Sequence, residues 1–468
     1  MDRRTEVQTG HEGNVGREER EGPREGTEHQ LTNQLEEQTR AEEFLPPSRP
    51  AAEPPREALV GWDDAHCWHP FTQQGTYRDS DPLLIVSGDG HYLVDINGRR
   101  YLDGVSSRWC NLLGHSRPEI DEAIREQLIR IAHSTFHGHA NVPAVTLAHR
   151  LAERAPTGLT RVFFTDDGST AVRAALQMAG EFWRQSDETP DHARTDFLGL
   201  MGASHTTMPY AGATLIEAGS PAQFLELLER EGHRLAAAVL EPGVQIAAGA
   251  RVQPAGFVTE VREAATRAGT FLIADETAIG FGRSGAMFAS DKEGIAPDLL
   301  CLSNGLTGGY LPMGVTLATE RIHDRFVDRR DEGRLFAHGY TFSGNQLAAS
   351  AALATLDVFD RTGLLDRLPG RVAHLESVLE PLRELPGVAE VRQYGLVAGI
   401  ELESEDDTQS AAERARDVCH RARAHGVFIL AAGDVVMLVP PLTITQPELG
   451  MLAAAVDAGC REQAGVAS

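Results

Sequence analysis

The stretch CLSNGLTGGYLPMG, residues 301–314, sets the fold class of this 468-residue chain. Its first two residues complete a short apolar run, LLCL (299–302), of the kind that forms a buried strand. A turn follows, in which Gly308 and Gly309 supply the backbone freedom that a tight connection needs. The next apolar run, GVTLAT (314–319), begins a few residues later, so the pattern predicts two buried strands joined by a glycine-rich turn.

The same rhythm extends through the central part of the chain. From about residue 160, short apolar or β-branched runs alternate with helical patterns. The runs predict strands at 161–166, 197–202, 235–242, 270–276, 298–303 and 314–319, with helices at 171–183 and 257–269 between them. Strands separated by helices are typical of a mostly parallel sheet covered on both faces. The chain is therefore expected to be an α/β protein.

The flanking parts predict a smaller α+β domain. Apolar runs separated by turn sequences predict short strands within 83–104, and an amphipathic helix is expected from Pro118 to His133. A long helix, further strands and a final helix follow residue 355. We expect four parts: an acidic tail (1–57), the first part of a small domain (58–114), a large domain (115–355) and the rest of the small domain (356–468).

Composition limits the partners. Residues 1–57 hold 14 acidic residues and 8 arginines, so they are expected to be a disordered tail, with order beginning near Trp62. The five cysteines are scattered, which favours reduced thiols, and the absence of a leader or a bilayer-length apolar run predicts a cytoplasmic protein. The net charge of −25 argues against nucleic acid or an anionic membrane as a partner.

Polar residues stand where the predicted strands end, which is where open parallel sheets bind their ligands. Gly168 and Ser169 open a helix directly after a strand and suit a phosphate group. Asp275 ends a very apolar strand, where a carboxylate needs a partner such as a protonated ring nitrogen. Thr341 offers a second phosphate donor. Each signal alone fits an ordinary turn or cap equally well.

Together, these motifs resemble the class III, or fold-type I, pyridoxal-phosphate (PLP) aminotransferases, and most of all their diaminopelargonic acid branch. The matching stretches are CWHPFTQ (67–73), YLDGVSSRWCNLLGH (101–115), FFTDDGSTAV (163–172), VLEPGVQ (239–245), LIADETAIGFGRSG (272–285), APDLLCLSNGLTGG (296–309) and HGYTFSGNQLA (338–348). The resemblance covers roughly residues 60–460. It implies a seven-stranded, mostly parallel sheet, a small-molecule substrate and a homodimer with its active site at the subunit interface.

The resemblance also assigns residues. Gly168 and Ser169 match the family's phosphate-binding pair, and Thr341 matches a threonine that reaches the phosphate from the other subunit. Asp275 matches the partner of the pyridine nitrogen, and Gln245 lies in a motif near the cofactor, as does Glu241.

The departures from the family gather at the reaction centre. Asn304 stands where the family carries the lysine that holds the cofactor as a Schiff base and moves the proton during transamination. An amide has no basic nitrogen and does neither. Lys292, the only lysine in the chain, is expected to face solvent before the strand that leads to Asn304.

Other departures agree with this one. Ser204 stands in place of an aromatic residue that stacks on the cofactor ring, while the neighbouring His205 is retained. Arg173 replaces a glutamate after the phosphate turn, Arg108 replaces one member of a Trp-Trp pair, and Leu430 replaces an arginine that grips the substrate carboxylate. Turn and glycine motifs are intact, so the scaffold is kept while the chemistry differs.

Three functions fit these residues. The first is an enzyme repurposed for chemistry other than transamination on a small carbonyl or amine. It uses Asn304, His205, Arg173 and Arg108 without PLP, or it holds PLP or pyridoxamine phosphate (PMP) non-covalently. The second is a PLP-dependent aminotransferase with an unusual base, and the third an inactive partner of an active paralogue. A metal site at His133, His137 and His139 is less favoured than a polar interface loop, so no metal is expected.

Overall fold

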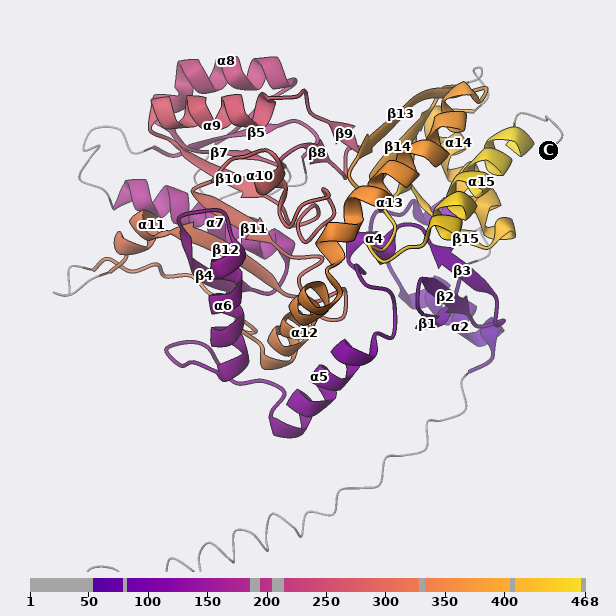
Figure 1. Cartoon of the computed structure of the whole chain (residues 1–468), viewed down its shortest axis with the longest axis horizontal. Helices are drawn as coiled ribbons and strands as arrows, with labels where there is room; N and C mark the ends of the chain where they lie inside the picture. Colours follow the sequence, from indigo (N-terminus) through magenta and orange to yellow (C-terminus); the bar gives the residue numbers. More distant parts are fainter. Residues whose placement is uncertain are drawn as a thin grey trace, which may run out of the picture. The chain divides into compact units, whose positions relative to one another are not determined.

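The computed structural model describes residues 54–78, 82–185, 194–203, 214–327, 333–404 and 409–463 (Figure 1). The chain forms two compact units, residues 1–82 and 83–468, and each is treated by itself. The predicted tail lies almost wholly outside the described residues.

The described part of the first unit is a pair of helices, α2 (Arg56–His66) and α3 (Gln74–Arg78). The Asp63 carboxylate accepts hydrogen bonds from Tyr77 Oη at 2.8 Å and from His69 Nε2 at 3.2 Å, which joins the two helices. Helical structure thus begins at Arg56, earlier than the predicted start near Trp62. Trp62 itself lies in the second half of α2.

The second unit is built around a seven-stranded sheet in the order β4-β12-β11-β10-β7-β5-β6. Its strands are β4 (Leu159–Thr165), β5 (Asp196–Leu200), β6 (Leu215–Ala218), β7 (Leu235–Leu240), β10 (Phe271–Asp275), β11 (Leu299–Leu302) and β12 (Gly314–Thr319). Strands β11, β10, β7, β5 and β6 are parallel, and β12 runs antiparallel to both of its neighbours. The predicted α/β class and the mostly parallel sheet are therefore confirmed.

Helices cover both faces of this sheet, as the buried strands require (Figure 1). Phe271 and Ile273 of β10 pack in one apolar cluster with α7 (Gly168–Arg184). The intervening Leu272 packs on the opposite face in the cluster that holds α8 (Pro221–Glu231) and α9 (Phe257–Ala268). This alternation is the period-two pattern of a strand buried on both sides. The sequence had not predicted β6 or α8.

Further helices pack near β4, the strand at one edge of the sheet. Helix α12 (Gln346–Thr362) contacts α5 (Pro118–Arg130) and α6 (Val142–Arg154), while the short α11 (Glu320–Asp324) follows β12. Helix α5 stops at Arg130, three residues before the predicted end. Its expected apolar face is only partly used, because Leu128 is 57% exposed while Ile120 is fully buried.

The smaller part of this unit has two four-stranded sheets, ordered β1-β2-β3-β15 and β13-β14-β17-β16. Its strands are β1 (Ile85–Asp89), β2 (Tyr92–Asp95), β3 (Arg100–Asp103), β13 (Val388–Tyr394), β14 (Val397–Leu402), β15 (Val427–Phe428), β16 (Leu430–Ala432) and β17 (Val435–Leu438). Its helices are α13 (Leu364–Leu379), α14 (Ala411–Ala422) and α15 (Gln446–Gln463). None of the helices in the described ranges is both long and apolar enough to span a bilayer.

Candidate active site

The ends of β4, β10 and β11 meet at Gly168, the first residue of α7. A side chain at this position would place its Cβ 3.1 Å from Cβ of Thr277 and 3.2 Å from Cβ of Ser303, tighter than ordinary packing. Thr277 follows β10 and Ser303 follows β11, so glycine allows the three connections to approach each other closely. The Asp167 side chain caps α7 by accepting from Thr170 N at 2.8 Å. The first turn of α7 therefore opens at the carboxyl edge of the parallel strands, the expected place for a ligand.

Asp275 ends β10 at this edge and is 2% exposed. Its Oδ1 accepts hydrogen bonds from Thr277 Oγ1 at 2.6 Å and from Thr277 N at 3.2 Å. These bonds fix the direction of a buried carboxylate beside the Gly168 junction. Thr277 and Ser303, which the sequence did not indicate as site residues, pack closely against Gly168 at this junction. No local sequence pattern reports such a contact, because it joins segments that are far apart in the chain.

Asn304 stands directly after β11 on the same junction. Its backbone N donates to Thr277 O at 2.9 Å, and its side chain is partly buried. Within the described ranges, no hydrogen bond involves the side-chain amide of Asn304.

Lys292 lies at the end of α10 (Ala289–Lys292) and is exposed, as predicted, but its amine has partners. The Nζ atom lies 3.6 Å from the centroid of the Tyr394 ring and donates to Ser284 O at 3.1 Å. Although the residue as a whole is exposed, partial burial of its amine lowers the pKa of that group. The only lysine of the chain is thus engaged in a cation–π contact.

Thr341 lies on a turn beside the first turn of α7 in the same chain. Tyr340 Oη donates to Thr170 O at 3.3 Å, and Ser343 Oγ donates to Phe164 O at 2.9 Å. These two bonds attach the 340–343 turn to the segment that joins β4 to α7. Thr341 itself is exposed.

Arg173 is exposed on α7 and lies beside His338 and Tyr340. His338 Nε2 and Tyr340 Oη are 2.8 Å apart. Burial lowers the pKa of His338, and the charge of Arg173 lowers it further, so both favour the neutral imidazole. Sequence reasoning quoted this segment only for Thr341 and missed His338 and Tyr340.

An apolar wall joins Trp109 and Leu430 to the segment around Gln245. Trp109 and Leu430 pack against a cluster that includes Val244, Ile246 and Ile279. Gln245 belongs to the short strand β8 (Val244–Gln245), which pairs with β9 (Arg251–Val252).

Gln245 is 1% exposed, and its Nε2 donates to Leu200 O and Met201 O, each at 3.4 Å, at the end of β5. Glu241, at the end of β7, is also buried, and its carbonyl accepts from Gln253 Nε2 at 2.7 Å.

Some predicted residues fall elsewhere. Ser204 and His205 lie outside the described residues. In the histidine-rich loop, the His133 ring lies 4.9 Å from the Phe342 ring at a tilted angle of 53°, and His139 Nδ1 contacts His137 O at 3.0 Å. Within the described ranges, the ligand atoms close enough to share a metal belong to Glu320, His323 and Asp324, where Glu320 already pairs with Arg161.

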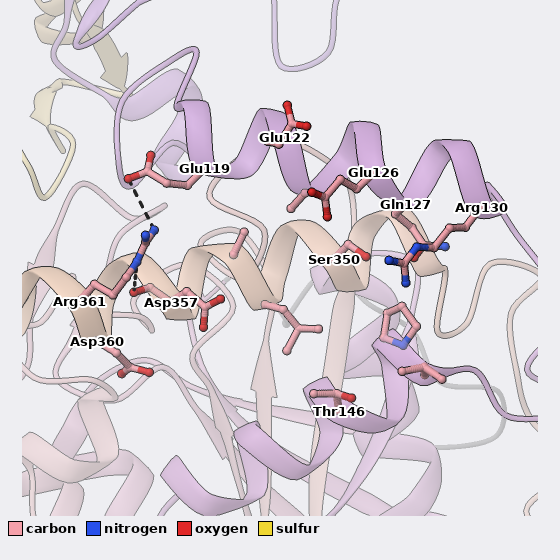
Figure 2. A pocket seen from close by; sticks show the side chains of 15 residues that line it. Glu119, Glu122, Glu126, Gln127, Arg130, Thr146, Ser350, Asp357, Asp360 and Arg361 are labelled. Atoms are coloured by element: carbon pink, nitrogen blue, oxygen red, sulfur yellow. Dashed lines mark hydrogen bonds and ion pairs between the residues drawn. The ribbon is translucent and has the colours of Figure 1, made fainter.

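A separate cavity of about 630 Å³ lies between α5, α6 and α12 (Figure 2). Its lining is acidic, with Glu119, Glu122, Glu126, Asp357 and Asp360, and Arg361 lies 3.6 Å from Glu119. None of the predicted site residues lines it. The strand ends, and not this cavity, form the candidate site.

The comparisons with known proteins agree with this geometry. The family model described as "Aminotransferase class-III" matches residues 76–213 and 203–457. The chain belongs to the class III aminotransferase family. This family uses PLP and acts on small-molecule substrates. The predicted fold-type I architecture is thereby confirmed.

Two relatives of this class III chain carry the name adenosylmethionine-8-amino-7-oxononanoate aminotransferase. The protein of Nitratidesulfovibrio vulgaris is 43% identical over 433 residues, covering 84% of this chain and 80% of the relative. That of Geobacter sulfurreducens is 41% identical over 436 residues, covering 85% and 96%. The crystal structure of the Methanocaldococcus jannaschii enzyme of this name superposes with a TM-score of 0.82 at 35% identity, covering 87% of this chain and 99% of that one.

Proposed function

We propose that this class III protein holds PLP or PMP without a covalent bond and acts on a small amine or carbonyl compound. The proposal rests on the identity of residue 304, which is an asparagine at the junction of the strand ends. Asn304 occupies the place of the family's Schiff-base lysine in this proposal, while the sole lysine is bound to Tyr394 and Ser284. Neither group supplies an amine to the site.

The residues present fit such a cofactor. The Gly168 position, where a Cβ would crowd Thr277 and Ser303, brings the N–H groups of the first turn of α7 close to the strand ends, where Ser169 adds a hydroxyl for a phosphate. The buried Asp275 carboxylate would hold a pyridine nitrogen protonated. When bound, the cofactor supplies an electron sink for reactions at a carbon next to nitrogen.

Without a lysine amine, another group has to move protons or the reaction has to differ from transamination. We favour chemistry other than transamination, in which Asn304 and Arg108 bind and orient the substrate through hydrogen bonds and charge. Arg173 and His205 complete this proposal, although His205 lies outside the described residues. Leu430 on the apolar wall would deprive a substrate carboxylate of its usual arginine.

A second function is supported by the relatives. Proteins at 43% and 41% identity are named as aminotransferases, which favours transamination with a base other than lysine. His338 suits this role, because it lies beside the first turn of α7 through Tyr340 and a neutral imidazole can accept a proton. In both functions we propose a homodimer, in which Thr341 serves the neighbouring site.

Absorption and mass measurements on the purified protein test these functions. The proposal expects PLP to bind reversibly, to shift its spectrum on binding, and to leave an unchanged protein mass after borohydride reduction. A borohydride-fixed adduct within the active site would overturn the non-covalent mode.

A protein that remains colourless with PLP, and does not bind PMP in calorimetry, would instead indicate a cofactor-free site. Turnover of 8-amino-7-oxononanoate, the compound in the relatives' name, would support transamination with another base. A native complex with an active paralogue would support the inactive-partner function.

A further inference from the structure

Four consecutive residues of this chain have left-handed backbone conformations although none is glycine. They form the short α4 turn (Ser106–Trp109), with φ angles of 49°, 47°, 67° and 73°. Side chains with a Cβ disfavour this region, because the Cβ approaches the following carbonyl oxygen. A run of this kind persists only where the surrounding structure determines it.

The Asp103 carboxylate holds this turn from one side. Asp103 is fully buried at the end of β3. Its Oδ1 accepts from Ser107 N at 2.9 Å, and its Oδ2 accepts from Ser107 Oγ at 2.7 Å. His115 Nε2 lies 3.0 Å from the same Oδ2, and His115 Nδ1 lies 2.8 Å from Asn111 Nδ2. The carboxylate is thus fixed in direction by Ser107 within the turn and by His115 after it.

Arg283 holds the turn from the other side. Its side chain is fully buried, and the nearby charge of Asp103 opposes the lowering of its pKa by burial. Its guanidinium donates to Pro440 O and, at 3.3 Å, to Ser106 Oγ, which itself donates to Val439 O at 2.7 Å. Burying a cation is costly, and the bonds to these oxygens together with the charge of Asp103 offset part of that cost.

The residues that follow the turn pack against the loop that carries Asn304. A Cβ on Gly309 would lie 2.9 Å from Asn111 N, and one on Gly305 would lie 2.5 Å from Leu112 Cδ1. The residues that follow the turn therefore pack against the residues that follow Asn304. At the turn itself, the Arg108 guanidinium lies 5.2 Å from the Trp109 ring.

We propose that Asp103 and Arg283 are positioning residues that hold the 106–109 turn left-handed and so direct Arg108 and Trp109 toward a carboxylate-bearing substrate beside Asn304. The substrate role rests on the proposed function, whereas the clamp itself does not. Arginine suits a carboxylate because its fork of donors matches two oxygens. This assignment would give the site a carboxylate-binding group in the absence of an arginine at Leu430.

Substituting Ser107 tests the backbone conformation. Ser107→Gly and Ser107→Ala both remove the hydroxyl that binds Asp103, and they differ in the cost of a positive φ. Trypsin cleavage after Arg108 in the folded protein reports local opening of the turn. We expect cleavage at this bond to be about fivefold or more faster in Ser107→Ala than in Ser107→Gly. Equal rates, or faster cleavage of the glycine variant, would overturn the left-handed clamp.

Asp103→Asn tests the positioning role. We expect cleavage after Arg108 to rise about tenfold while cleavage at other arginines is unchanged, because one hydrogen-bonded charge is lost. Affinity for 8-amino-7-oxononanoate, used as the carboxylate probe, should fall by about the same factor, while affinity for PMP stays within about twofold. Adding Ser107→Gly to Asp103→Asn should restore probe binding, an outcome that a merely structural role does not give.

The failures can be told apart. Equal loss of PMP and probe affinity in Asp103→Asn, or a wild-type protein that binds PMP but not the probe, would overturn the positioning of the substrate. A wild-type protein that does not bind PMP would contradict the proposed function, and the Ser107 pair would still decide whether the clamp exists. If Asp103→Asn does not fold, Ser106→Ala, which removes the Arg283 contact, replaces it in both measurements.

Discussion

At the scale of single residues, the site combines groups that suit a phosphorylated ring cofactor with one that does not form a covalent bond to it. In the proposed function, Gly168 would help to hold a phosphate and the buried Asp275 a ring nitrogen. Asn304 shares that junction through its bond to Thr277, and an amide is a hydrogen-bonding group without a basic nitrogen. Under the proposed function, the side chain at residue 304 decides whether the cofactor is held with or without a covalent bond.

The substitution Asn304→Lys tests the position of residue 304. If the junction is the cofactor site that we propose, the new amine should become fixed to PLP by borohydride, with the adduct mapped to residue 304 by mass spectrometry. Asn304→Gln, which adds length but no amine, serves as the control and should remain unmodified. An adduct confined to Lys292 in the Asn304→Lys variant would contradict the placement.

Asp275→Asn tests the ring-nitrogen contact. We expect PMP affinity in calorimetry to fall by about 10- to 100-fold, since hydrogen bonds to charged groups contribute more than neutral ones. The shape of the site should be kept, because asparagine can still accept from Thr277. The exposed substitution Glu122→Gln, on α5, should leave the affinity unchanged; an unaltered affinity in Asp275→Asn would remove this residue from the site.

At the scale of elements, short helices and turns are held by buried carboxylates. Asp103 binds the α4 turn, and Glu276 binds the start of α10. The Glu276 side chain is fully buried and accepts from Ala289 N at 2.5 Å, from Ser290 N at 2.7 Å and from Ser290 Oγ at 2.5 Å. Asp275 and Glu276 are adjacent in sequence, yet one carboxylate serves the site and the other serves a helix.

Glu276 should make stability depend on pH. Burial raises the pKa of this carboxyl to about 7, although the Ser290 and Ala289 bonds oppose the shift. A raised pKa means that the folded protein keeps the proton more tightly than the unfolded chain, so stability falls as pH rises toward 7. We expect wild type to lose up to about 3 kcal/mol between pH 4.5 and pH 8 relative to Glu276→Gln, measured by urea unfolding.

In that comparison the absolute stability of Glu276→Gln is unimportant, because its amide meets backbone N–H donors at every pH. The prediction concerns only how steeply the free energy of unfolding changes with pH in wild type compared with Glu276→Gln. Parallel curves for the two proteins would show that Glu276 is ionised throughout this range.

At the scale of the whole second unit, its first strands pack with its C-terminal segment. Strand β15 pairs in parallel with β3, with Val427 opposite Leu102, and Val439 N donates to Gly104 O at 2.7 Å. A Cβ on Gly104 would lie 2.7 Å from Ile429 Cγ2 and 2.9 Å from Leu452 Cδ2. The clamp on the α4 turn depends on the same junction, because Val439 and Pro440 supply its acceptors.

Gly104→Ala should therefore weaken the second unit as a whole. We expect a loss of about 1–3 kcal/mol from overpacking, seen as a lower midpoint of thermal unfolding. Gly450→Ala is the matched control: Gly450 lies in α15 with open space around it, so alanine should stabilise by about 0.5–1 kcal/mol. Similar midpoints for the two variants would mean that the junction adapts to the added methyl group.

Local patterns were enough to predict the strands and the residues at their ends. Apolar or β-branched runs of six to eight residues predicted β4, β5, β7, β10, β11 and β12, because a strand buried on both faces is apolar at nearly every position. Strand β6 was missed because its only four residues, LIEA, include a charged one. Helix α5 ended early because Ile131 has extended backbone angles, which side-chain periodicity alone does not report.

The sequence by itself determined the α/β class, which follows from its periodicity, and indicated the family through the resemblance of its short motifs. It also placed polar residues after the strands, because a strand and the residue that follows it are neighbours in the chain. Only the tertiary structure decided the partners of Lys292, the convergence at Gly168, and the clamp of Asp103 and Arg283 on the α4 turn. Each of these joins segments far apart in sequence: Arg283 meets Ser106 across 177 positions and Pro440 across 157. Such contacts arise from packing of the whole unit, and a left-handed turn of serine, arginine and tryptophan persists because that packing holds it.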